Sequence, residues 1–167
     1  NFEKGEFMQL PLAGFGARKG APATAIHDSI FIKAAAMKVE NRLMVFVGAD
    51  LLIMPPNITD SVMRVLSGKG FTRDQIYFSA THTHSSLGAW GPGFTGKEFA
   101  GEENKNLEKW LVSKISEAVI KAVDDLKPAG IATGDFDAAS YTRNRLIGEL
   151  STKNDDFSYI FIQQNEG

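Results

Sequence analysis

Runs of apolar residues alternate with chain breakers along the sequence and predict strands and helices in turn. Residues 30–39 and the wholly apolar run 43–47 flank a Glu40-Asn41 turn, which predicts a β-hairpin. The second of these strands is apolar on both faces, so we expect it at the centre of a sheet. Short runs rich in β-branched and aromatic residues predict further strands over residues 76–80, 130–136 and 159–162.

Two other segments repeat apolar residues at three- and four-residue spacing, which predicts amphipathic helices over residues 57–68 and 104–126. The candidate N-caps are Asn57 or Thr59 for the first helix and Asn104 or Asn106 for the second. Residues 86–101 are rich in glycine and lack periodicity, which predicts a long loop that is either functional or mobile. Because strands and helices alternate, the sequence predicts an α/β fold in which helices pack on a mixed sheet.

The length of 167 residues is sufficient for a single domain over residues 1–167. Residues 1–20 contain too many glycines for a regular element and are expected to form a loop. At the other end, residues 165–167 directly follow a predicted strand and resemble a hairpin turn whose returning strand is absent. We therefore expect the chain to be an incomplete portion of a larger α/β domain.

Composition narrows the possible partners and chemistry. Eighteen Lys and Arg residues against twenty Asp and Glu leave a net charge of −2, so no basic excess would attract nucleic acid. No apolar run approaches the ~20 residues that a membrane-spanning helix needs, so no transmembrane segment is expected. The absence of cysteine excludes disulfides, cysteine-based zinc sites and thiol nucleophiles. Imidazole chemistry rests on three histidines.

Two of the three histidines, His82 and His84, directly follow the strand predicted over residues 76–80. Alternate residues of a strand face the same side, so both rings are expected to face one pocket at the carboxyl edge of the sheet. Neutral imidazole suits zinc, and catalytic zinc keeps an open coordination position. The alternative is a pair of ordinary hydrogen-bonded histidines, because an H-x-H dipeptide alone is a weak motif.

His27 and Asp50 precede and follow the predicted hairpin strands, and each admits two interpretations. His27, next to Asp28, is either a turn residue or part of a site at the sheet edge. Asp50 ends the second strand, where its carboxylate would either accept the ring N–H of a histidine or belong to the turn before Pro55.

Arg143 and Arg145 flank Asn144, so in an extended segment both guanidinium groups would face the same way. Such a pair either binds an oxyanion or forms ordinary solvated surface. Ser85 lies outside any G-x-S-x-G sequence, so a serine-hydrolase nucleophile finds no support. Three aromatic residues of the Gly-rich segment would either line the mouth of an apolar site or pack the loop onto the domain: Trp90, Phe94 and Phe99.

Several segments, taken in order, resemble the N-terminal catalytic domain of the neutral/alkaline, non-lysosomal ceramidase family. The segments that carry the resemblance are LAGFGAR (12–18), AIHDSIFIKAAAM (25–37), VFVGADLL (45–52), YFSATHTHSS (77–86) and TRNR (142–145). ATHTHS after a strand, followed by a glycine-bearing loop, is the most specific of these. The resemblance extends over most of the chain.

This resemblance implies a zinc-dependent amidase that cleaves the N-acyl bond of ceramide to a fatty acid and a sphingoid base. Matched by position, His82 would be a zinc ligand, His84 would contact the reacting group, and Arg145 would be the active-site arginine. The neighbourhood of the site would include His27, Asp50, Ser85 and Arg143. In the family the remaining zinc ligands and the catalytic serine come from later sequence.

The resemblance also implies partners and a location. The substrate would be a small-molecule lipid amide, with transient contact to a membrane surface left open, and the protein would be secreted or periplasmic. Ser86 and Leu87 replace the Gly-Pro usual after the histidines, and Leu146 replaces a serine common after R-N-R. Two alternatives therefore accompany this prediction: a related amidase with a non-sphingolipid substrate, and a non-catalytic fragment with the ceramidase-like fold.

Overall fold

The computed structural model describes residues 9–148 and 152–165 and divides the chain into two compact units, the first ending at Leu126 and the second beginning at Lys127. In its described part, the first unit contains three strands, β1 (Ile32–Val39), β2 (Arg42–Ala49) and β3 (Ile76–Ala80), and three α-helices, α1 (Pro56–Ser67), α2 (Gly93–Ala100) and α3 (Lys105–Asp124). The second unit contains β4 (Ala129–Asp137) and β5 (Asp156–Gln164).

The sheet of the first unit has the order β1-β2-β3, with β2 in the centre. Strands β1 and β2 form the antiparallel hairpin that the sequence predicts, and β3 pairs with β2 in parallel through a register that ends at Ala49 and Ala80. The α/β class and the central position of β2 are therefore confirmed. Since β2 and β3 are parallel, their carboxyl ends meet at one edge of the sheet.

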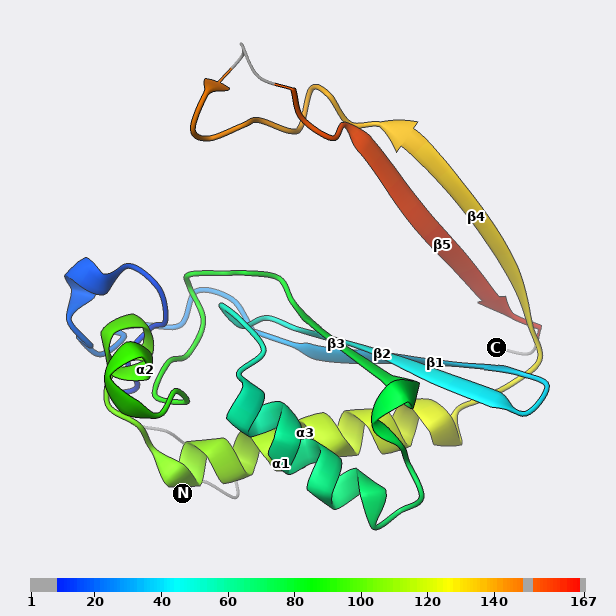
Figure 1. Cartoon of the computed structure of the whole chain (residues 1–167), viewed down its shortest axis with the longest axis horizontal. Helices are drawn as coiled ribbons and strands as arrows, with labels where there is room; N and C mark the ends of the chain where they lie inside the picture. Colours follow the sequence, from blue (N-terminus) through cyan, green and yellow to red (C-terminus); the bar gives the residue numbers. More distant parts are fainter. Residues whose placement is uncertain (1–8, 149–151, 166–167) are drawn as a thin grey trace. The chain divides into compact units, whose positions relative to one another are not determined.

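Helices α1 and α3 pack on the same side of this sheet (Figure 1). Alternate residues of β2 turn toward the helices, and Val45 and Val47 are fully buried there. The apolar stripe of α1 contributes Ile58, Val62 and Leu66, and that of α3 contributes Leu107, Leu111, Ile115 and Val119. Each such side chain stabilises the fold by about 1.5–3 kcal/mol when fully buried. The packing of α1 and α3 against the sheet therefore supports the strands β2 and β3, whose carboxyl ends form the edge described above.

Two local predictions differ from the structure in this unit. The segment 86–101, predicted as loop, contains the helix α2, because Gly93 and Gly96 weaken the helical signal without preventing the helix once it is packed. The N-cap of α1 is Pro55 rather than Asn57 or Thr59, and no side chain caps that end. At α3 the prediction is confirmed, since the side-chain oxygen of Asn104 accepts hydrogen bonds from two backbone N–H groups.

The second unit is an antiparallel hairpin of β4 and β5. Both strands were predicted, but they form a two-stranded sheet of their own rather than further strands of the mixed sheet. The turn predicted at 165–167 lies partly outside the described residues. The assignment of residues 1–167 to one domain stays a prediction.

Candidate functional site

His82 and His84 lie just beyond the carboxyl edge of β3, and their rings face each other edge-on. The ring centroids are 5.1 Å apart with an interplanar angle of 81°. Strand alternation does not cause this pairing, because β3 ends at Ala80 and His82 has a left-handed backbone with φ of 57°. The two rings do lie together, but the reason expected for this, that they share one face of an extended strand, is wrong. A turn at a strained residue brings the rings together.

The ring of His82 is oriented by main chain. Its Nδ1 lies 2.8 Å from the carbonyl oxygen of Leu52, an acceptor, so Nδ1 carries the proton and donates it. The lone pair of the neutral ring is then on Nε2. Histidines that bind metals characteristically donate their other ring N–H to a carbonyl or carboxylate in this way.

The Asp50 carboxylate bonds to the main chain of Phe31 and not to the ring of His82. One of its carboxylate oxygens accepts the backbone N–H of Phe31 at 2.9 Å, which ties the start of β1 to the end of β2. This contact gives Asp50 a structural role at the strand ends, and its assignment to the neighbourhood of the site stays a prediction. The carbonyl of Leu52 orients His82 instead.

The two histidines line a largely apolar cavity of about 490 Å³. This volume falls within the usual range of sites for small molecules. Trp90 and Phe99 from the Gly-rich segment line the cavity, whereas Phe94 is 79% exposed. The other lining residues include Gly14, Phe15, Leu52, Ile53, Pro55, Asn57 and Pro92. An apolar ligand with one polar group beside the histidines would suit this lining.

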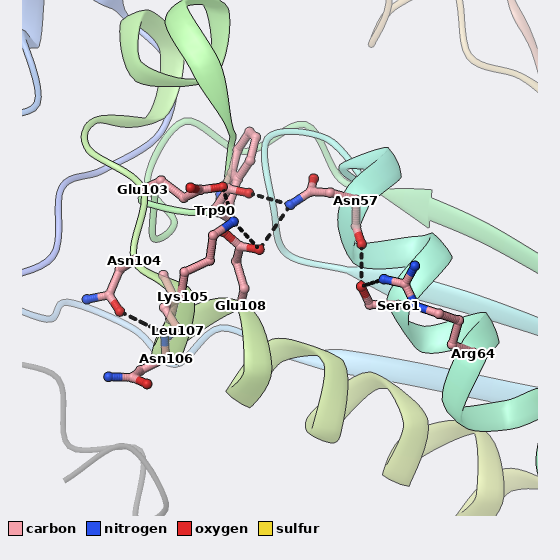
Figure 2. A network of polar contacts seen from close by, with 10 residues as sticks. All are labelled: Asn57, Ser61, Arg64, Trp90, Glu103, Asn104, Lys105, Asn106, Leu107 and Glu108. Carbon is pink, nitrogen blue, oxygen red and sulfur yellow. Dashed lines mark hydrogen bonds and ion pairs between the residues drawn. The ribbon is translucent and has the colours of Figure 1, made fainter.

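A network of polar contacts fixes two of these lining residues. Figure 2 shows Asn57 of α1 pointing its amide toward the carbonyl of Trp90 and toward Glu108 of α3, at 3.1 and 3.3 Å. Lys105 joins Glu103 to Glu108 in the same network. Burial, together with the contact to Glu103, raises the pKa of the Glu108 carboxyl above its ordinary value. The hydrogen bond from Lys105 lowers the pKa of Glu103.

His27 and Ser85 are exposed. The His27 side chain is 96% exposed and pairs with Asp28 at 3.0 Å between Nδ1 and Oδ2. His27 is not among the residues that line the cavity. At Ser85 the backbone N–H donates to the hydroxyl oxygen of Thr83 at 3.2 Å. The assignment of both residues to the neighbourhood of the site stays a prediction.

Arg143 and Arg145 belong to the second unit, and both are exposed. The side-chain oxygen of Asn144 accepts the backbone N–H groups of Leu146 and Ile147, which folds this segment into a turn. The extended geometry under which both guanidinium groups would face the same way is therefore not present from Asn144 onward, because the Asn side chain accepts these backbone donors. The active-site role of Arg145 stays a prediction.

The chemistry of His82 fits a metal ligand, since one ring nitrogen is held by a carbonyl and the other keeps its lone pair. Residues 9–148 and 152–165 contain no group of three or more His, Asp or Glu side chains placed to hold a metal ion. A zinc ion bound through His82 would therefore need ligands beyond those the described residues gather. Zinc binding itself stays a prediction.

The sequence gives little local sign of two features of this site. Gly14 and Phe15 lie against His84, yet they precede it by about 70 residues and belong to a segment without periodicity. Their presence in the LAGFGAR segment, one of those shared with a known family, is the only signal that could have found them. Asn57 was interpreted as a helix cap, whereas its side chain bridges α1 and α3 beside the cavity.

Comparisons with known proteins place these observations in a family. Residues 4–148 match a family model, which is described as the N-terminal part of neutral/alkaline non-lysosomal ceramidase. A solved neutral ceramidase from Pseudomonas aeruginosa superposes with a TM-score of 0.78 at 19% identity, over 95% of this chain and 28% of that one. A ceramidase complexed with C2 superposes with a TM-score of 0.76, also at 19% identity, over 95% of this chain and 27% of that one. The chain thus spans little more than a quarter of these solved chains.

Proposed function

The chain belongs to the neutral/alkaline non-lysosomal ceramidase family, and from this premise we propose that it is part of a zinc-dependent amidohydrolase. The reaction would be hydrolysis of the N-acyl amide bond of ceramide-like lipids to a fatty acid and a sphingoid base. The observation that carries the proposal is the juxtaposition of His82, with its Nε2 lone pair free of the Leu52 contact, and an apolar cavity of about 490 Å³.

Each residue has a proposed role in this reaction. Zinc, when bound, supplies Lewis-acid chemistry that polarises a carbonyl and acidifies water. His82 would hold the ion through Nε2, while the Leu52 carbonyl fixes the orientation of its ring. His84 faces the reacting amide from the same cavity wall. Arg145 offers a fixed positive charge to the developing oxyanion, a role that rests on the family resemblance.

The lining of the cavity supports a lipid amide over a polar substrate. Leu52, Trp90 and Phe99 offer apolar and aromatic surface next to the two imidazoles. Burial of a methylene group contributes about 0.8 kcal/mol, so part of an alkyl chain in this cavity would provide substantial binding energy. The polar amide would then lie at the histidines, where the chemistry is available.

The test uses the intact protein with two substrates, a short-acyl ceramide and an N-acyl amino acid, and measures release of fatty acid by mass spectrometry. We expect the ceramide to be hydrolysed by the wild type and its hydrolysis to fall to background in His82→Ala. Asn106→Ala, a change at an exposed residue of α3, is the matched control and should keep full activity. Full activity in His82→Ala would refute the role of His82. Hydrolysis of the N-acyl amino acid alone would favour the related amidase with a non-sphingolipid substrate.

We extend the proposal to a secreted or periplasmic location and to a small-molecule lipid as the partner. Within the described residues, no helix is long and apolar enough to span a bilayer. Fractionation of cells that express the intact protein, with the protein detected by immunoblot, tests the location. Recovery in the cytosolic fraction alone would contradict it.

A further inference from the structure

The segment from Ala13 to Arg18 wraps around His84, although it lies far away in sequence. Its start is anchored by two backbone hydrogen bonds: the N–H of Ala13 donates to the carbonyl of Ser86 at 3.0 Å, and that of Gly14 to the carbonyl of Phe99 at 2.7 Å. The segment is therefore built into the wall of the cavity rather than lying loosely over it.

Three residues of this segment contact His84 from different directions. A Cβ built at Gly14, whose φ is +81°, would lie 2.7 Å from Cγ of His84 and would collide with Nδ1. The ring of Phe15 lies 4.4 Å from the His84 ring, centroid to centroid. Arg18 donates from Nη1 to the His84 carbonyl at 2.7 Å, and its guanidinium lies 4.8 Å from the centre of the Phe15 ring. The segment thus contacts both the ring and the backbone of His84.

The close approach of Gly14 leaves Nδ1 of His84 buried and, among the described residues, without a hydrogen-bond partner. A buried N–H without an acceptor is rarer and more costly than a buried lone pair, so the neutral ring carries its proton on Nε2. His82 has the opposite tautomer, because its Nδ1 donates to Leu52. The two histidines therefore present different groups to the ligand, a lone pair from His82 and an N–H donor from His84.

We infer that Gly14, Phe15 and Arg18 are positioning residues that fix the rotamer and tautomer of His84, so that its Nε2–H serves as a hydrogen-bond donor to a substrate oxygen. The inference deepens the proposed function and rests on it for the identity of that oxygen as the amide carbonyl. A donor aimed at this atom stabilises the charge that develops on it during acyl transfer. Glycine at position 14 is required because any side chain there would displace the ring.

The experiment compares Gly14→Ala and Arg18→Ala with Gly16→Ala in the intact protein. Gly16 lies in the same segment, and a Cβ there would only reach ordinary contact, 3.7 Å from the Glu98 carbonyl oxygen, so Gly16→Ala is the matched control. Ring nitrogens are observed by ¹⁵N NMR after histidine labelling, and the His84 signals are identified by their loss in His84→Asn. Arg18→Ala adds no bulk, so it keeps the test decisive if Gly14→Ala fails to fold.

We expect wild type and Gly16→Ala to show His84 protonated on Nε2. Arg18→Ala and folded Gly14→Ala should shift the tautomer signals, leave zinc content unchanged, and lower kcat by about 10–100-fold with little change in KM. A wild-type His84 protonated on Nδ1 would overturn the inference, as would Gly14→Ala and Arg18→Ala proteins that match Gly16→Ala. If the wild type hydrolyses no ceramide, the proposed function fails, while the NMR comparison still decides the positioning role.

Discussion

Asn57→Ala is expected to loosen the wall of the cavity. Its side-chain amide donates to the carbonyl of Trp90 at 3.1 Å and to the Glu108 carboxylate at 3.3 Å, and these contacts join α1 to the Gly-rich segment and to the start of α3. The first bond contributes about 1 kcal/mol and the second, to a charged group, about 1.5 kcal/mol. Alanine is the better helix former by about 0.5 kcal/mol. The net loss is therefore about 2 kcal/mol.

Hydrogen exchange of the intact protein, read by mass spectrometry on peptides from residues 86–110, measures this loss locally. A change of about 2 kcal/mol corresponds to roughly a 30-fold fall in protection for amides that exchange through opening of this region. Asn106→Ala serves as the control because it replaces an exposed asparagine on the same part of α3. Equal protection in Asn57→Ala and Asn106→Ala would refute the assigned role of the network.

Asn57→Asp distinguishes the effect of the polar contacts from the effect of removing side-chain volume, because aspartate has nearly the same size as asparagine. The new carboxylate would lie next to Glu108, so at pH 7 repulsion should make this variant less protected than Asn57→Ala. Acidification to about pH 4 protonates such a pair and should remove most of the difference. A difference that does not depend on pH would contradict the electrostatic explanation.

Three further predictions follow from the same contacts. Burial raises the pKa of Glu108, so its protonated form stabilises the fold fully below the unfolded-state pKa, and this stability is lost as pH rises through the folded-state pKa. Glutamine cannot ionise, so Glu108→Gln should gain stability relative to wild type between about pH 4 and 7, measured by urea unfolding. A hydrogen bond from the Thr142 hydroxyl, and to a lesser extent one from Lys153, lowers the pKa of Asp155. This pairing therefore stabilises the second unit above the unfolded-state pKa and less as pH falls. Thr142→Val should reduce the hydrogen-exchange protection of β4 and β5 at pH 7, and the difference from wild type should shrink toward about pH 3. Leu111→Ala empties a site that is 2% exposed and should destabilise the first unit by about 2–5 kcal/mol in the same unfolding assay, whereas a loss below 1 kcal/mol would contradict the packing of α3.

Regular elements with a strong apolar period could be predicted from the sequence. The β1–β2 hairpin, the strand β3 and the helix α3 with its Asn104 cap were all predicted close to their observed bounds. In each of these cases local propensity and burial favour the same conformation. Helix α2 could not be predicted, because three glycines between Gly91 and Gly96 obscure its pattern and packing of Ala100 stabilises it instead.

The pair of histidines in the candidate site could be singled out from the sequence, but the geometry of the site could not be predicted. His82 and His84 were identified from spacing alone, yet a left-handed turn at His82 brings the rings together, and spacing carries no sign of it. The partner of His82 is a main-chain carbonyl at Leu52, which no residue pattern can mark. The contact between Gly14 and His84 depends on how distant segments pack, and such long-range contacts leave no local periodicity.

We propose that His82 is a metal ligand and that His84 acts beside the metal without binding it. Zinc content per molecule of the intact protein, measured by plasma mass spectrometry after gel filtration, tests this claim most directly. We expect stoichiometric zinc in the wild type and in His84→Ala, and loss of zinc in His82→Ala. Zinc retained in His82→Ala, or lost equally in both variants, would contradict it.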